Sequence, residues 1–275
     1  MGKYKYKMLC LDLDGTLLNS EHKISRENKK SIQALSEDIQ VVLVSARPPA
    51  GIICFLDELN ISAPVICYNG ALIFDEHGRQ IYDMTIAPNV IRDIYQKYSC
   101  EVSINIYIKN DWYVEKKDKW VRQEEKIIGL KPRIVNLKKL LYDTANTDKI
   151  ATVEKGANKI LLMGIKQTIT GVEKFLRRKH GKRLEIYMSK AEYLEIVAEG
   201  VSKTGAIKIL QKKYNITERE IAAIGDNYND LDMLNYAGLG VAVDNAPEKV
   251  KKEADRVTLS NDDNGVTKAI KNLII

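Results

Sequence analysis

The sequence predicts an α/β protein, with a core built on a parallel β-sheet and a second, α+β unit inserted into the middle of the chain. Short continuous apolar runs recur in the first and last thirds of the chain. Each is followed by a polar loop, which is typical of strands buried on both faces of a parallel sheet. Residues 86–189 instead include strands that alternate apolar and polar residues, which indicates half-exposed antiparallel pairs. We therefore expect a core of residues 1–85 and 190–275 with an insertion at 86–189.

Composition indicates an ordinary globular protein, because 45% of the 275 residues are hydrophobic and 29% are charged. No apolar run approaches the roughly 18 residues of a membrane span, so we expect no membrane partner. The four cysteines show no CxxC spacing, and a reducing cytoplasm is the simplest location. The net charge of +6 comes from residues 86–189, where 22 Lys and Arg stand against 12 Asp and Glu. That basic excess fits an anionic small molecule, a polynucleotide or a solvated surface.

The first predicted strand, Met8–Leu11, runs directly into two carboxylates and a glycine, Asp12, Asp14 and Gly15. A buried parallel strand delivers the residues after it to the carboxyl edge of the sheet, where open α/β folds bind ligands. Two acids placed close together repel each other unless a cation or a shared proton lies between them. An ordinary turn after a core strand would also use Asp and Gly. A calcium loop starting at Asp12 does not fit, since its sixth position would be leucine instead of glycine.

The rest of the first third alternates helix and strand, which predicts right-handed parallel connections. A helix is expected from Ser25, its N-cap, to Glu37. Strands and a hairpin with a glycine turn follow, at Val41–Val44, Pro64–Tyr68, Leu72–Phe74 and Gln80–Asp83. Ser45 comes directly after a buried strand, where its hydroxyl and the neighbouring backbone amides suit a phosphate, or where it serves only as a helix N-cap. Asn69-Gly70-Ala71 follows the third strand.

The inserted unit is expected to contain an antiparallel pair, Val102–Ile108 with Trp112–Val114, packed with helices. The other expected elements are helices at Val90–Tyr98, Trp120–Ile128 and Gly171–Lys179 and strands at Lys159–Met163 and Leu184–Met188. The continuous apolar runs that are typical of a parallel sheet resume after Tyr193–Val197.

Lys203 opens the next predicted helix, which runs to Tyr214. A lysine in the first turn opposes the helix dipole and makes sense beside an anion, although a solvent-facing lysine is equally consistent with the sequence. The strand Ile221–Ile224 then ends in a second acidic loop with Asp226, Asn229 and Asp230. The remaining expectations are a helix that stops near Gly238, a strand at Gly240–Val243, a helix capped by Asn245 with Pro247 in its first turn, and a C-terminal helix with Val266, Ile270 and Leu273 inward.

These loops predict one crevice that holds carboxylates, a hydroxyl and an ammonium. Magnesium prefers such oxygen ligands, and phosphoryl transfer needs positive charge around the phosphoryl oxygens. The sequence lacks a Cys–His set for zinc, GxGxxG and the P-loop signature, and its three histidines lie outside every motif. The four motifs, Asp12-Leu13-Asp14-Gly15-Thr16, Ser45, Lys203 and Gly225–Asp230, resemble those of the haloacid dehalogenase superfamily. Their order and the long insertion are similar to its Cof-type phosphatases.

The resemblance covers essentially the whole chain and implies a Rossmann-like core, an inserted cap at about residues 86–189, and Mg²⁺-dependent hydrolysis of phosphate monoesters. It implies that Asp12 is the nucleophile that forms an aspartyl-phosphate and that Asp14 is the general acid and base. The implied metal site uses Asp12, Asp226 and the backbone carbonyl of Asp14, with Asp230 in support. The implied phosphate-binding residues are Leu13, Ser45, Ala46, Lys203 and Asn229. Two motifs depart from the commoner pattern: the second reads Ser45-Ala46-Arg47 where Thr-Gly-Arg is commoner, and Lys203 is followed by Thr204 where glycine is usual.

The expected partner is a small phosphorylated metabolite, in particular a sugar or polyol phosphate if basic residues of the insertion meet the substrate. A phosphotransferase or mutase would use the same intermediate, and a non-catalytic binding module would keep the fold without turnover. A nucleic-acid binder would need a continuous basic face with exposed aromatic residues, and no nucleic-acid partner is expected.

Overall fold

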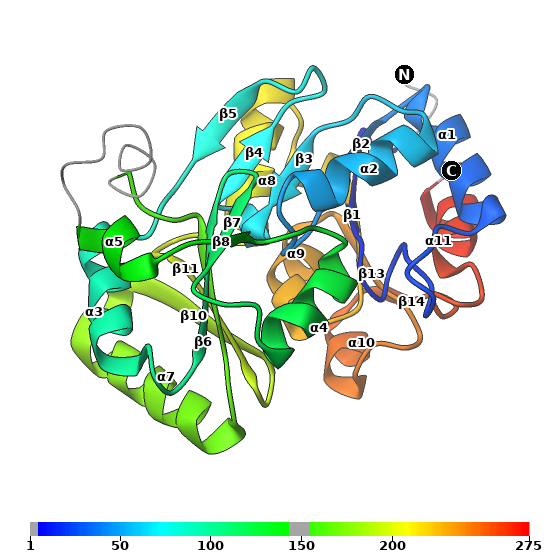
Figure 1. Cartoon of the computed structure of the whole chain (residues 1–275). Coiled ribbons are helices and arrows are strands. Elements are labelled where there is room, and N and C mark those ends of the chain that lie inside the picture. The colour runs from blue at the N-terminus through cyan, green and yellow to red at the C-terminus, as the bar shows by residue number, and fades with distance from the viewer. Residues whose placement is uncertain (1–4, 143–154, 275) are drawn as a thin grey trace. The chain divides into compact units, whose positions relative to one another are not determined.

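The computed structural model describes residues 5–142 and 155–274, which form two compact units (Figure 1). The first unit runs to Ala46 and then comprises Ile52–Ile81 and everything from Ser202 onward. The second unit comprises Tyr82–Val201 together with Arg47–Gly51. Along the chain, the long segment Tyr82–Val201 therefore lies between two parts of the first unit. Among the described residues, no helix has the length and apolar character needed to cross a membrane.

The first unit is built on an eight-stranded sheet in the order β14-β13-β12-β1-β2-β3-β4-β5. Every pairing from β14 to β3 is parallel, and β4 pairs antiparallel with β3. The strands are β1 (Met8–Asp12), β2 (Gln40–Val44), β3 (Val65–Cys67), β4 (Leu72–Phe74), β5 (Gln80–Asp83), β12 (Ile221–Gly225), β13 (Leu239–Ala242) and β14 (Arg256–Val257). This confirms the predicted α/β class with a parallel-sheet core.

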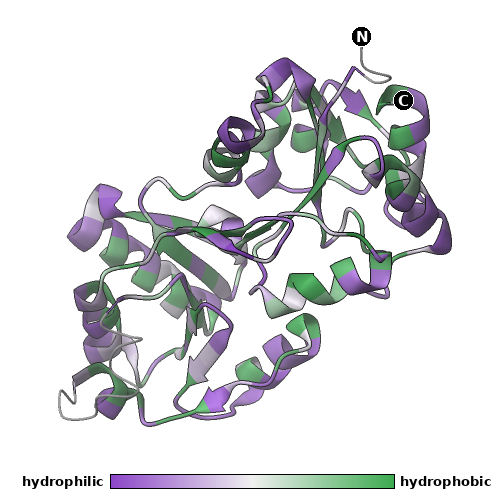
Figure 2. Ribbon diagram, turned by 90° about the horizontal axis from the view of Figure 1, so that it is seen from above, coloured by the Kyte–Doolittle hydropathy of each residue, from purple (hydrophilic) through white to green (hydrophobic). Residues whose placement is uncertain are grey.

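Helices lie on both sides of this sheet, which explains why β1 and β12 are buried along their whole length. The helices are α1 (Arg26–Ser36), α2 (Ala50–Leu59), α8 (Lys203–Tyr214), α9 (Leu231–Tyr236), α10 (Glu248–Glu253) and α11 (Gly265–Ala269). Helix α1 contacts α11, and α9 contacts both α8 and α10. In Figure 2 the apolar residues gather on the strands and on the helix faces turned toward them.

The register of β1 brings three loops to one edge of the sheet. Leu11 lies beside Ile224 of β12, and Asp12 lies beside Val44 of β2. Because these strands are parallel, the chain leaves all three at the same carboxyl edge. The loops that follow carry Asp14, Ser45 and Asp226.

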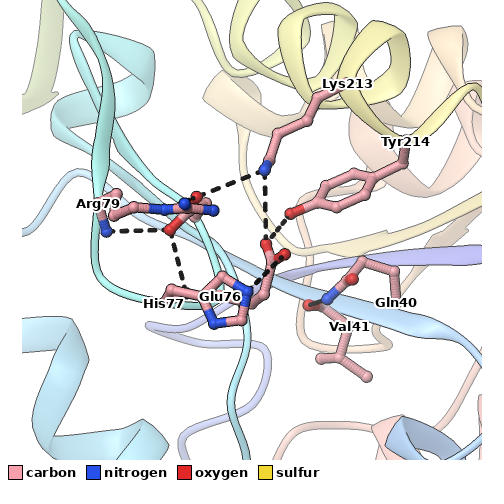
Figure 3. A network of polar contacts seen from close by, with 8 residues as sticks. Gln40, Val41, Glu76, His77, Arg79, Lys213 and Tyr214 are labelled. Carbon is pink, nitrogen blue, oxygen red and sulfur yellow. Dashed lines mark hydrogen bonds and ion pairs between the residues drawn. The ribbon is translucent and has the colours of Figure 1, made fainter.

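The hairpin of β4 and β5 is attached to the end of α8 by charged and hydroxyl groups (Figure 3). Asp75 accepts hydrogen bonds from the backbone N–H groups of His77 and Arg79 and from Arg79 Nε, at 2.9–3.0 Å. Lys213 Nζ lies 3.4 Å from the same carboxylate, and the Tyr214 hydroxyl donates to Glu76. The bonds from His77, Arg79 and Lys213 lower the pKa of Asp75 to about 2, although its burial acts in the opposite direction.

The second unit contains a six-stranded sheet in the order β10-β11-β9-β6-β7-β8. All described pairings are antiparallel except that of β7 with β8. Its elements are α3 (Pro88–Tyr98), β6 (Ser103–Ile108), β7 (Asp111–Val114), α4 (Lys119–Ile128), β8 (Arg133–Ile134), α5 (Leu137–Tyr142), β9 (Lys159–Met163), α7 (Lys166–His180), β10 (Leu184–Lys190) and β11 (Tyr193–Ala198).

The antiparallel pairing of β6 with β7 confirms the sequence-based prediction, but the prediction that this pair is half exposed is wrong. Five of the six residues of β6 are buried. Figure 1 shows α3 and α7 on one side of the sheet and α4 on the other, so neither face of β6 is left to water. On the α4 side the Tyr107 hydroxyl meets Glu124 at 3.5 Å.

The predicted return of the core after residue 190 also differs from the structure. Strand β11 pairs with β9 and β10 and so belongs to the second sheet. Its apolar run resembles a parallel core strand because the second sheet, too, is covered on both sides. The basic excess persists within the observed unit, which has 24 Lys and Arg against 16 Asp and Glu.

Two predicted details near the C-terminus are wrong. Asn245 does not cap α10, because Pro247 occupies the residue before the helix. The Asn245 side chain instead donates to the Gly15 carbonyl at 2.8 Å and accepts from the Asn261 N–H at 2.9 Å. At the end of the chain Leu273 is half exposed and Ile274 is buried, since the last turn is a π-helix (Ile270–Ile274) instead of an α-helix.

Candidate active site

The first loop places Asp12 at the end of the central strand with only 6% of its surface exposed. Gly15 makes the turn possible, because its φ of +83° lies in the left-handed region. It also lets the loop approach its neighbour: a Cβ at this position would lie 2.6 Å from Asp226 Oδ2. Thr16 then donates its hydroxyl to Asp226 Oδ1 at 3.1 Å. The first and the last acidic loops therefore meet, as their positions after parallel strands predict.

Lys203 is the buried cation of this site. Ser202 caps α8 by accepting the Gly205 N–H, and Lys203 is the first helical residue. Its Nζ lies 2.5 Å from Asp12 Oδ1 and 2.6 Å from Asp230 Oδ1. Only 2% of Lys203 is exposed, so the alternative of a solvent-facing lysine is wrong. Burial acts to lower the pKa of Lys203, but the two carboxylates raise it above its usual value and hold the ammonium charged.

Asp230 is fully buried and uses both of its oxygens. One oxygen meets Lys203, and the other accepts the backbone N–H groups of Asp226 and Asn227 at 3.0 Å. Gly225 allows this fold of the loop, since a Cβ there would lie 2.7 Å from the Asp230 side chain. Asp230 therefore fixes both the lysine and the loop that carries Asp226.

The donor set of the site fits a divalent cation. Oxygens of Asp12, Asp226 and Asp230 lie within 4.8 Å of one another, and Lys203 sets one ammonium against these three carboxylates. Burial first, and then the charge of Asp230, raise the pKa of Asp12 well above its usual range and that of Asp226 to about 7. With all three carboxylates ionised, the negative charge exceeds that of the ammonium by two units, which a dication would neutralise. Because both Asp230 oxygens are engaged, Asp12 and Asp226 are the carboxylates suited to direct ligation.

The remaining predicted residues lie along the same sheet edge. Ser45 is buried, with its N–H bound to the Ile66 carbonyl at 2.9 Å, and Ala46 follows it. Leu13 is buried directly after Asp12. Asn229 is half-buried and donates its side-chain N–H to Asn69 Oδ1 at 3.3 Å.

Comparison with known proteins identifies the family of this site. A family model described as haloacid dehalogenase-like hydrolase matches residues 9–270. The chain belongs to the haloacid dehalogenase-like hydrolases. It is 30% identical to the phosphatase YwpJ of Bacillus subtilis over 98% of this chain and 100% of that protein. It is 29% identical to the 5-amino-6-(5-phospho-D-ribitylamino)uracil phosphatase YwtE of the same organism, over 98% of both chains.

A solved structure agrees with this assignment. The crystal structure of a haloacid dehalogenase-like hydrolase from Bacteroides thetaiotaomicron covers 98% of this chain and 100% of its own, with a TM-score of 0.87 and 31% identity. The family and the α/β architecture suggested by the four motifs are thereby confirmed.

In this hydrolase, the environment of Asp14 differs from that of the three clustered acids. Its side chain is 40% exposed, and its carboxylate is not one of the three grouped carboxylates. His22 Nδ1 lies 3.7 Å from Asp14 Oδ1. His22 reaches this position because the loop folds back on itself, with an isolated β-bridge between Leu18 and Ile24. No sequence motif predicts this pairing.

Asn69 is a second residue whose position the sequence did not reveal. It follows β3, is 4% exposed, and contacts both Ser45 and Asn229. The available signal was the Asn69-Gly70 pair, which commonly indicates a turn. It did not indicate that the turn would lie among the site residues.

Proposed function

We propose that this phosphatase of the haloacid dehalogenase-like family hydrolyses a small phosphate monoester, with Mg²⁺, through a phosphoryl group held covalently on Asp12. The observation that supports it best is the buried Asp12 carboxylate, 2.5 Å from the Lys203 ammonium and grouped with Asp226 and Asp230. A nucleophile at that point meets a phosphoryl group surrounded by compensating positive charge.

In the first step an Asp12 oxygen attacks phosphorus, the P–O bond to the leaving group breaks, and Asp14 donates a proton to the departing alkoxide. The 40% exposure of Asp14 suits a group that reaches a leaving alcohol and later water. In the second step the Asp14 carboxylate takes a proton from water, the water oxygen attacks phosphorus, and the bond to Asp12 breaks. Inorganic phosphate leaves and both aspartates regain their initial states.

Asp12, Asp226 and the Asp14 backbone carbonyl would hold the Mg²⁺, with Asp230 supporting the loop. When bound, the ion supplies charge neutralisation of the phosphoryl oxygens. Lys203 offsets the remaining charge and keeps Asp12 oriented. In this proposal the phosphoryl oxygens are bound by the five residues expected from the sequence, Leu13, Ser45, Ala46, Lys203 and Asn229.

A sugar or polyol phosphate is the proposed substrate class, selected by the inserted unit acting as a cap. Two features support this choice. The relative YwtE is named for a substrate whose phosphate sits on a ribityl chain. The inserted unit is basic, which favours anionic and hydroxyl-rich molecules.

Transfer of the phosphoryl group to an alcohol acceptor is the second candidate reaction, since it uses the same Asp12 intermediate. We also propose a cytoplasmic location, which is supported by four cysteines that show no CxxC spacing.

A panel of phosphorylated metabolites, assayed for phosphate release with Mg²⁺ and with EDTA, tests the proposal. We expect release from sugar or polyol phosphates that EDTA abolishes and Mg²⁺ restores. Turnover that is insensitive to EDTA, or an absence of turnover across the panel, would contradict it. An added polyol that accelerates substrate consumption without equivalent phosphate release would favour transfer.

A further inference from the structure

The turn after β3 has an unusual backbone conformation. Tyr68, Asn69 and Gly70 all have φ in the left-handed region, at 54°, 56° and 113°. Non-glycine residues adopt this region at a cost in free energy, and a tyrosine rarely does so. Tyr68 and Asn69 are also buried, so the surrounding structure holds the turn in place. We therefore look for the reason for this strained conformation in the contacts that the turn makes.

The turn contacts three of the segments that carry site residues. The Asn69 N–H donates to the Ser45 carbonyl at 3.0 Å. The Asn69 side-chain oxygen accepts from Asn229 Nδ2 at 3.3 Å. Gly70 lies against the residue before Lys203, where an added Cβ would be 2.3 Å from the Ser202 carbonyl oxygen. The turn therefore joins the second, third and fourth motifs.

We propose that Asn69 is a positioning residue that orients Asn229 and the Ser45 loop for binding of the phosphoryl group. This inference rests on the proposed function, in which Asn229 and Ser45 bind phosphoryl oxygens. By accepting one N–H of the Asn229 amide, Asn69 fixes which end of that amide is the donor and where its second N–H points. The left-handed turn is what brings the Asn69 oxygen and its N–H to two different loops.

Asparagine is the residue that meets all of these demands together. It tolerates a positive φ better than most side chains, and it carries a neutral acceptor. Glycine would accept the backbone conformation but has no acceptor for Asn229. Aspartate would keep an acceptor but would bring a negative charge toward an anionic ligand.

Substitution by glycine separates the side chain's role from that of the backbone. Asn69→Gly keeps the left-handed turn and the N–H bond to Ser45, and it removes the side chain that bonds to Asn229. Asn60→Gly is the matched control, because Asn60 also has a positive φ of 53° and is exposed, outside the site. The readouts are the dissociation constant of inorganic phosphate with Mg²⁺, measured by calorimetry, the KM and kcat for a phosphate ester, and the thermal midpoint.

We expect Asn69→Gly to weaken phosphate binding and raise KM by about tenfold or more, because a small misplacement of a binding group has large effects. Asn60→Gly should leave both within about twofold, and both variants should unfold near the parent temperature. Adding Asn69→Gly to Asn229→Ala should change phosphate binding no further, since Asn69 acts through Asn229.

Phosphate affinity of Asn69→Gly equal to that of Asn60→Gly would overturn the inference, as would fully additive effects of Asn69→Gly and Asn229→Ala. A parent protein that hydrolyses esters while Asn69→Gly behaves like the control would refute only the role of Asn69. A parent that neither binds phosphate with Mg²⁺ nor hydrolyses any ester would refute the proposed function and this inference together.

Discussion

Replacing Asp14 by asparagine should reveal acid–base catalysis through its dependence on the leaving group. The change keeps the shape of the side chain and removes its ability to give or take a proton. The Asp14 carboxylate is not among the three acids within 4.8 Å of one another, so their charge balance with Lys203 is retained. Its backbone carbonyl is also unchanged. We therefore expect Mg²⁺ affinity to stay close to that of the parent.

The expected loss of rate far exceeds any expected loss of stability. A positioned general acid or base contributes about 10²–10⁴-fold, which corresponds to roughly 3–5 kcal/mol of activation free energy. One contact that Asp14 weakens on substitution is its pair with His22 at 3.7 Å, between side chains that are 40% and 57% exposed. Exposed pairs of this kind are worth about 0–1 kcal/mol before any discount for an uncharged histidine. A fall in activity would therefore report on chemistry and not on unfolding.

The assay compares two esters with different leaving groups. A sugar phosphate releases a strongly basic alkoxide that needs a proton, and we expect kcat/KM for it to fall by about 10²–10⁴-fold. p-Nitrophenyl phosphate releases a weakly basic phenolate that needs none, so its first step should remain within about tenfold of the parent. Because the second step still lacks its base, rapid mixing should show a burst of nitrophenolate equivalent to the enzyme, followed by slow turnover. Asp57→Asn, at an exposed aspartate outside the site, is the control.

An unchanged rate with the sugar phosphate would refute the assignment of Asp14. Equal losses with both esters and no burst would also refute it, because a residue needed only for binding or folding does not distinguish leaving groups.

Three other perturbations test separate parts of the account. Asp12→Asn should abolish turnover and weaken Mg²⁺ binding. The protein should stay folded, because Asp230 still pairs with Lys203. Steady-state turnover within about tenfold of the parent, which is about 1.4 kcal/mol of activation free energy, would exclude Asp12 as the nucleophile. The lowered pKa of Asp75, about 2 in the folded protein, means that its contribution to stability is present above the unfolded pKa and is lost as pH falls toward 2. The difference in thermal midpoint between the parent and Asp75→Asn should therefore shrink between about pH 4 and pH 2, and a constant difference would contradict the hydrogen-bond assignment. If the basic inserted unit attracts substrate, kcat/KM should fall more steeply with salt for a doubly phosphorylated sugar than for a singly phosphorylated one. The reason is that exposed charges are screened over about 8–10 Å near physiological salt. Equal slopes would show that this unit has no electrostatic role in attracting substrate.

Much of the site could be predicted from sequence because it follows from strand ends. Asp12 and Asp226 come after buried runs, and parallel strands bring such residues to one edge. The misplaced helix-start lysine, Lys203, was a weaker signal, and its meaning became clear only with its two carboxylate partners in place.

Contacts that depend on loop paths could not be predicted in this way. His22 reaches Asp14 by a loop return, and Asn245 binds the Gly15 carbonyl instead of capping a helix. Neither contact has a periodicity or a spacing that sequence patterns can reveal. The sequence predicts that the core resumes at residue 190, whereas Tyr193–Ala198 pairs within the second sheet; burial on both faces gives the same apolar run in either unit.

Acid-quench mass spectrometry measures directly whether Asp12 carries a covalent phosphoryl group. Asp14→Asn is mixed with p-nitrophenyl phosphate and Mg²⁺, quenched in acid during the burst, and digested. We expect one phosphoryl group per enzyme, on the peptide that contains Asp12, and none in Asp12→Asn treated in the same way. A full burst of nitrophenolate with no phosphoryl group on that peptide, or with the group on another residue, would contradict it.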